Sequence, residues 1–175
     1  MSISVLPFGW LVWFAALAFV LHVAEEWLGG FTEWVQGQVN PHYTQTHYRR
    51  IHVAGMVVGL LGAGVLTIYP NTVLLVIYFA TIATPWFVWN SMFHVGATVR
   101  WRRYCPGVVT AVVVYMPFSI VLVASVIREH LVPGRWLVLA AGIGLVIHAL
   151  EVRKNVFRYG SKSQDNTSPI KAPRY

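Results

Sequence analysis

Five long apolar runs are the feature of this sequence that most restricts its fold. They are Val5–Leu28, Ile51–Tyr69, Thr72–Thr98, Gly107–Ile127 and Pro133–Val152. Each run has about the 20 residues that a helix needs to cross a bilayer. Within lipid, only helices and closed barrels satisfy every backbone polar group, and runs of this length are typical of helices. The sequence therefore predicts an all-α integral membrane bundle of five transmembrane helices.

The composition agrees with this prediction. Hydrophobic residues make up 57% of the chain and charged residues only 11%, against roughly 25% charged in soluble domains. The net charge of +7 would suggest a nucleic-acid partner in a soluble protein. Here the basic residues lie between the apolar runs and in the tail, as they do in the cytoplasmic flanks of membrane helices. We therefore expect the lipid bilayer, and no nucleic acid, as the partner.

The positions of the basic residues also predict the orientation. If the spans alternate in direction, eleven of the 13 Lys and Arg residues fall on one side, which the positive-inside rule assigns to the cytoplasm. The N-terminus is then outside and the C-terminus cytoplasmic. No basic residue precedes the first run, which argues against a removable signal peptide. We expect one transmembrane domain over residues 1–159 and a basic, disordered cytoplasmic tail over 160–175.

The segment between the first two runs, Gly29–Arg50, is too polar to span. Its first part carries Phe31, Trp34 and Val35, which would let it lie along the membrane interface until Pro41 ends it. Within the third run, Pro85 predicts a kink.

Ionisable residues inside the apolar runs are costly and mark functional sites by default. His22 shares a helix face with Glu25 and Glu26, because positions three and four apart lie on the same face. With alternating spans, all intramembrane histidines and glutamates fall in the cytoplasmic third of the bilayer. The sequence therefore predicts one polar site from several helices, built from His22, Glu25, Glu26, His52, Asn90, His94, His148 and Glu151.

Imidazole and carboxylate ligands favour iron, manganese or zinc, and the single cysteine, Cys105, excludes a cysteine-rich zinc site. His22/Glu25 and His148/Glu151 have the one-turn spacing of His and Glu in di-iron and di-manganese bundles. We predict two divalent ions, with iron as first choice and zinc or manganese as alternatives. The expected ligands are His22, Glu25, Glu26, His94, His148 and Glu151. Asn90 would orient a metal-bound histidine, and His52 is either a further ligand or a supporting residue.

A site with one metal ion is the alternative. His22-Val-Ala-Glu25-Glu26 is similar to the inverted zinc-protease signature, with Glu in place of the final His. His22 and Glu26 would then bind zinc together with His94 or His148. Glu25 would act as the general base on water.

A turn with basic residues precedes the fourth run. Arg100, Arg102 and Arg103 lie before Pro106 and Gly107, where a helix begins. Because helix N-termini and arginines attract anions, these residues are candidates for contact with an anionic head group or a phosphate.

Three motifs together resemble a known family. They are His22-Val-Ala-Glu25-Glu26, then Asn90-Ser-Met-Phe-His94, then Arg103-Tyr-Cys-Pro106-Gly107. In this order they resemble the motifs of the HXXEE family, which groups small multi-spanning prokaryotic membrane proteins. The resemblance implies a bacterial or archaeal cytoplasmic membrane and an uncharacterised, enzyme-like function. It extends from the first run to the fourth but leaves Gly29–Arg50 unmatched, and it does not include His148 or Glu151.

From these features we predict a membrane metalloenzyme that oxidises a lipid-phase or otherwise apolar substrate with a di-iron centre, the substrate entering between helices. Glu25 and Asn90 are the predicted catalytic residues. A zinc-type hydrolase with Glu25 as base is the first alternative. A proton or ion relay is another, although it would also need ionisable groups in the outer half. A non-catalytic scaffold, in which buried polar groups fix the helix packing, is the last.

Overall fold

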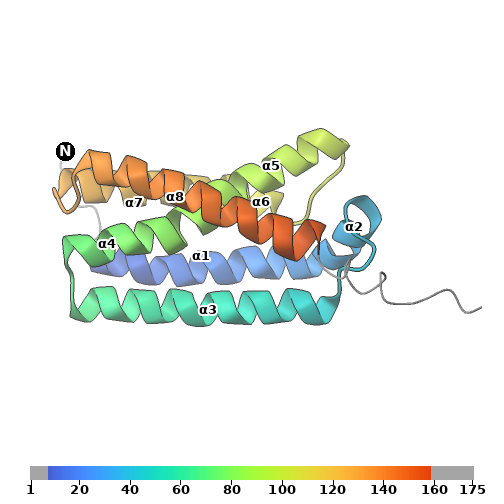
Figure 1. Cartoon of the computed structure of the whole chain (residues 1–175), viewed down its shortest axis with the longest axis horizontal. Coiled ribbons are helices and arrows are strands. Elements are labelled where there is room, and N and C mark those ends of the chain that lie inside the picture. The colour runs from blue at the N-terminus through green and yellow to red at the C-terminus, as the bar shows by residue number, and fades with distance from the viewer. Residues whose placement is uncertain (1–7, 159–175) are drawn as a thin grey trace, which may run out of the picture.

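The computed structural model describes residues 8–158, and its regular elements are helices. Five helical spans are long and apolar enough to cross a membrane: Phe8–Leu28, Gln45–Ile68, Thr72–Trp101, Val108–Arg128 and Gly134–Phe157. Successive spans run in opposite directions along the bundle (Figure 1). The predicted all-α fold, with five helices that could span a membrane, is thus confirmed. The membrane side on which each end lies stays a prediction, and the 160–175 tail lies outside the described residues.

Three of the spans contain π-helical turns as well as α-helix. The first two are the single helices α1 (Phe8–Leu28) and α3 (Gln45–Ile68), with the short α2 (Phe31–Gln38) between them. The third is α4 (Thr72–Tyr78), the π-helical η1 (Phe79–Trp89) and α5 (Asn90–Trp101). The fourth is α6 (Val108–Thr110), the π-helical η2 (Ala111–Tyr115) and α7 (Met116–Arg128). The fifth is α8 (Gly134–Val152) followed by the π-helical η3 (Arg153–Phe157).

The second span begins before its apolar run does. It was predicted from Ile51, but α3 begins at Gln45, because Thr44 caps it by accepting a hydrogen bond from the His47 backbone N–H at 3.2 Å. Apolar length measures the part of a helix that crosses lipid, whereas capping decides where the helix itself begins. The helix therefore continues beyond the apolar run, through Arg49 and Arg50.

The third span changes direction between α4 and α5 (Figure 1), where η1 contains Pro85. Proline lacks an N–H, and the wider π-helical turn accommodates the missing hydrogen bond. The Thr84 hydroxyl donates to the Phe79 carbonyl at 2.9 Å and satisfies one of the acceptors in this region. The bend expected at Pro85 thus takes the form of a π-helical segment.

Close packing holds the fifth span against η1. A Cβ atom on Gly144 would lie only 1.9 Å from Thr84 Oγ1, so only glycine allows α8 to approach this closely. The indole of Trp89 donates to the Ala141 carbonyl at 2.9 Å and fixes the same contact. As a result, the last turns of α8 lie at the end of the bundle where α5 also ends (Figure 1).

Helix α2 closes this end of the bundle (Figure 1). Its residues Phe31 and Val35 are buried and belong to a cluster with Tyr48, Ala97 and other residues of the neighbouring spans. The segment was expected to rest on the membrane interface through these side chains. They instead pack into the protein, because they cover the buried polar groups described next.

Candidate metal site

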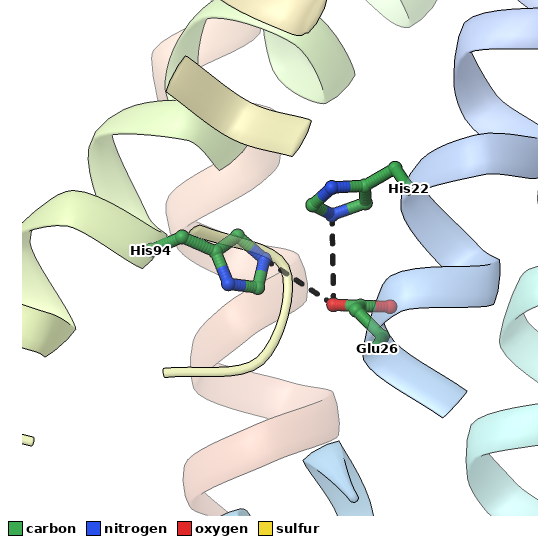
Figure 2. A group of neighbouring side chains, drawn as sticks. All are labelled: His22, Glu26 and His94. Atoms are coloured by element: carbon green, nitrogen blue, oxygen red, sulfur yellow. Dashed lines mark ion pairs between the residues drawn. The ribbon is translucent and has the colours of Figure 1, made fainter. Parts of the chain in front are cut away.

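His22, Glu26 and His94 form a buried group at the closed end of the bundle (Figure 2). Their exposed fractions are 2%, 3% and 0%. His22 and Glu26 come from α1, one turn apart, and His94 comes from α5. The Nε2 atoms of His22 and His94 lie 3.6 and 3.2 Å from the same oxygen, Glu26 Oε1. One ligand atom from each residue lies within 4.8 Å of the other two.

The two distances to Glu26 Oε1 fit a shared metal ion. Ligand atoms bound at about 2.0–2.2 Å around a tetrahedral ion lie roughly 3.3 Å from one another. His94 Nε2 is buried and faces Glu26 Oε1 at 3.2 Å. Two imidazole nitrogens that face one carboxylate oxygen form ion pairs when protonated, and they can bind a metal ion together with that oxygen when neutral. The group could therefore hold a metal ion.

The hydrogen bonds of His22 direct one ring nitrogen toward Glu26. Its Nδ1 lies 2.8 Å from the Thr110 hydroxyl oxygen. That hydroxyl donates its proton to the Glu25 carboxylate, so His22 Nδ1 must be the donor to Thr110. Nε2 then carries the lone pair, which accepts a hydrogen bond from the Asn90 amide at 2.9 Å. Thr110 thus orients His22 through the ring nitrogen that faces away from Glu26, as the partners of metal-bound histidines do, whereas a metal ion on Nε2 would have to displace the Asn90 amide.

Glu25 turns away from the group and binds the start of the fourth span. Its Oε1 accepts hydrogen bonds from the Gly107 and Val109 backbone N–H groups and from the Tyr104 hydroxyl, at 3.1, 3.0 and 2.7 Å. Its Oε2 accepts from the N–H and the hydroxyl of Thr110. The first N–H groups of a helix lack internal partners, and Glu25 supplies them. This engagement of both oxygens favours a structural role over the predicted roles of ligand and general base.

The predicted anion site at this helix start is also affected. The N–H groups expected to bind a head group or a phosphate bind the Glu25 carboxylate instead. Arg100, Arg102 and Arg103 are exposed at the end of α5 and in the turn that follows, outside the buried group. Their contact with lipid head groups stays a prediction.

Gly107 lies directly against both histidines. It has a φ of +100°, and a Cβ atom there would lie 2.6 Å from His94 Cε1 and 2.9 Å from His22 Cε1. Any side chain would therefore displace both rings. This contact gives a physical reason for the Pro106-Gly107 pair beside the site.

The second oxygen of Glu26 has its own partners. Oε2 lies 2.9 Å from His52 Nε2 and accepts a hydrogen bond from the Tyr48 hydroxyl at 3.1 Å. His52 Nδ1 lies 2.8 Å from the Tyr48 carbonyl oxygen, to which it donates. His52 therefore holds Glu26 in place, as the supporting role considered for it requires.

A cavity of about 120 Å³ lies beside the group. The polar residues on its wall are Glu26, Tyr43, His52, Asn90, Tyr115, His148, Glu151 and Asn155. His148 and Glu151 thus face the same interior space as Glu26, but they are not among the three residues whose ligand atoms come together. The Phe93 ring packs against His94 and His148 alike, with centroids 5.2 and 6.3 Å away. Phe93 thus contacts a residue inside the group and one outside it.

Two further buried polar atoms on this cavity wall lack hydrogen-bond partners within residues 8–158. They are His148 Nε2 and the Tyr115 hydroxyl. Tyr115 also stacks on His22, with ring centroids 4.4 Å apart. Both side chains line the cavity, but the two atoms themselves are buried from it.

Cys105 lies behind His94, with Sγ 3.5 Å from Nδ1. Burial, together with the nearby carboxylates of Glu26 and Glu25, raises the pKa of its thiol to about 12. Burial and the hydrogen bond to Glu25 likewise raise the pKa of Tyr104 to about 12. Both groups are therefore protonated at neutral pH, and Tyr104 remains a hydrogen-bond donor to Glu25.

Sequence reasoning missed Thr110, Tyr48 and Tyr115. Threonine and tyrosine are common in membrane helices, so their presence carried no signal. Thr110 could have been suspected, because it lies in the first turn after Pro106-Gly107. The partners of Tyr48 and Tyr115 depend on the packing of spans distant in sequence.

The sequence model of a family described as "Protein of unknown function with HXXEE motif" matches residues 13–122. The match contains all three motifs and also runs across Gly29–Arg50, which the motifs alone had left unmatched. No curated protein and no solved structure matches the chain. In the structure, the three motifs meet at one place: the first supplies His22, Glu25 and Glu26, the second Asn90 and His94, and the third Gly107.

Proposed function

The chain belongs to the HXXEE family, as its motifs predicted, and we propose that it is a membrane-embedded enzyme with one divalent metal ion held by His22, Glu26 and His94. The buried group of these three side chains supports the proposal most directly. His22 Nε2 and His94 Nε2 both face the same oxygen of Glu26 there, at 3.6 and 3.2 Å. The family motifs supply all three ligands.

Three protein ligands would leave a position open on a metal ion, as in catalytic zinc sites with two histidines and one glutamate. The cavity of about 120 Å³ beside Glu26 and Asn90 would give a substrate access to an ion held there. A divalent ion there would supply Lewis acidity, which polarises a carbonyl group and acidifies water.

The reaction that these residues suit best is hydrolysis of an ester or amide bond in an apolar substrate. The oxygen of water bonds to the acyl carbon, the bond to the leaving oxygen or nitrogen breaks, and the proton of water ends on the leaving atom. We assign the transfer of that proton to His148, because its side chain lines the cavity and its Nε2 has no protein hydrogen bond in the described range; a small turn of the ring would have to expose this atom. Glu25 is less suited, since both of its oxygens are engaged at α6.

One ion is preferred to two because of where the other predicted ligands lie. Glu25 would have to leave the start of α6 to bind metal, and His148 would have to move away from Phe93. Either movement gives up hydrogen bonds or packing that the described residues now make. We therefore propose a three-ligand site in place of the di-iron centre first predicted from the sequence.

Iron-dependent oxidation is the second candidate. Two histidines and one carboxylate are also the ligand set of non-haem iron(II) oxygenases. This reaction, the first choice from the sequence, would consume oxygen and require an electron donor. The identity of the bound metal separates the two candidates, since iron favours oxidation and zinc favours hydrolysis.

Elemental analysis of the purified full chain tests the proposal. We expect about one metal ion per chain in the wild type, and almost none after His94→Ala or His22→Ala. His130→Asn is the control, because His130 lies in the connection between the fourth and fifth spans at the opposite end of the bundle. A ratio of about two ions per chain would instead support the dinuclear site predicted from the sequence. A wild-type protein that is folded but binds no metal would overturn the proposal in favour of the scaffold or the relay.

A further inference from the structure

A groove of about 500 Å³ lies between the third and fifth spans. Its wall includes Met92, Phe93, Leu145, His148, Ala149 and Arg153. We propose that this groove admits a lipid with one apolar chain and an anionic head group, and that this lipid is the substrate of the site. The inference rests on the proposed function for the reaction, but the binding of the lipid can be tested by itself.

The groove has an apolar part and one cationic end. Leu145 and Ala149 lie on α8, and Arg153 follows at the start of η3. From Leu145 to Arg153 the helix rises about 12 Å. Arg153 is exposed and has no ion-pair partner within residues 8–158. A guanidinium group binds a carboxylate or a phosphate through two hydrogen bonds, so the charge at this end suits an anionic head group.

The groove also borders the interior cavity. Phe93, His148 and Val152 line both spaces and form the wall between them. A lipid with its head group at Arg153 would place the first part of its chain beside His148, about 7 Å farther along the helix. The bond to be cut would then lie a few atoms from the anionic group, next to the residue proposed to move the proton.

A second groove gives room for a long chain. It has a volume of about 570 Å³, lies between the third and fourth spans, and shares Met92 with the first groove. Its wall is almost entirely apolar and extends along α7 to Ile127. Met92 thus separates the two grooves, and methionine adapts to irregular apolar shapes, so a turn of this side chain could join them. The two grooves together have room for a long single chain.

Photolabelling of the full chain in phosphatidylcholine nanodiscs tests the inference. The probe is palmitic acid with a diazirine at the chain end. Its control is the alcohol that has the same chain and the same diazirine. We expect the acid to label peptides of α5, α7 and α8 at least about tenfold more efficiently than the alcohol, as a charge-assisted contact allows. Unlabelled palmitate should compete with the acid.

Two pairs of variants locate the binding. Arg153→Gln should reduce labelling by the acid to the level of the alcohol, whereas Lys154→Gln, at a neighbouring position outside the groove, should leave it unchanged. Ala149→Trp should fill the groove and abolish labelling there by both probes. Val138→Trp is its control, because Val138 is exposed on the same helix but does not line the groove.

Equal labelling by acid and alcohol, or labelling that survives both Arg153→Gln and Ala149→Trp, would identify only boundary lipid and overturn the inference. The metal content of the same samples keeps the two proposals apart. Arg153→Gln and Ala149→Trp should bind as much metal as the wild type. If the wild type binds none, the proposed enzyme fails while the labelling still decides whether the groove binds this lipid.

Discussion

Thr110 Oγ1 accepts a hydrogen bond from His22 Nδ1 at 2.8 Å and passes its own proton toward Glu25. This chain of groups links the Glu25 carboxylate to Nδ1 of His22, the ring nitrogen opposite the one that faces Glu26. It fixes the orientation and the tautomer of His22 before any ligand arrives. Thr110 therefore supports the candidate metal site without being a ligand.

The first prediction concerns Thr110. Thr110→Val removes the hydroxyl with little change of shape, so His22 loses the acceptor for Nδ1 and can turn its protonated nitrogen toward Glu26. We expect metal affinity to fall by about 10–100-fold, as for other lost partners of metal-bound histidines. Competition with a chelator measures this metal affinity. Thr110→Ser, which keeps the hydroxyl, should bind like the wild type, and equal affinities in all three proteins would contradict this role.

A second prediction separates the two roles considered for Glu25. Glu25→Gln keeps the shape but weakens the charge-assisted hydrogen bonds to the start of α6. We expect stability to fall by about 1–3 kcal/mol. The number of bound metal ions should not change, because Glu25 is outside the group of His22, Glu26 and His94. Thermal unfolding measures the stability, and elemental analysis of the same sample measures the number of bound metal ions. Loss of metal with unchanged stability would indicate that Glu25 is a ligand.

Much of this site could be predicted from the sequence. The helical period places His22 and Glu26 on one face, and the alternation of spans brings His94 to the same depth. Asn90 follows from the same reasoning, because it lies one turn before His94. These inferences need only the spacing along a helix and the direction of each span, and the five-span fold provides both.

The side-chain partners could not be predicted in the same way. Glu25 and Glu26 are adjacent, yet one binds the start of α6 and the other joins the histidines. This difference depends on where the fourth span begins relative to α1, which no local pattern records. His148 likewise has the predicted depth, but it lies outside the group. The position of a residue along the bundle can be predicted from the sequence, whereas the partners of its side chain depend on how the helices pack.

A third prediction concerns the glycine beside the histidines. Gly107→Ala places a methyl group against His94 and His22 in a backbone conformation with positive φ. The backbone alone should cost about 1–2 kcal/mol, and displacement of the rings should remove most of the bound metal. Gly142→Ala is the matched control, because a Cβ atom there has no neighbour within 4 Å and the helix is retained. Comparable metal content in the two variants would show that the site tolerates displacement of the His22 and His94 rings.

The last prediction uses the pH dependence of Cys105. Burial raises the pKa of its thiol to about 12, so on the order of one molecule in ten thousand carries the reactive thiolate at pH 8. Iodoacetamide should therefore modify the folded protein slowly between pH 7 and 9, and rapidly once it unfolds. Because the folded pKa is above the unfolded one, the neutral thiol contributes stability that is fully present below the pKa of an ordinary cysteine. That contribution is lost as the pH rises from about 9 toward 12. Mass spectrometry of the alkylated chain measures the rate, and fast modification of the folded protein at pH 8 would place Cys105 outside the packed layer behind His94.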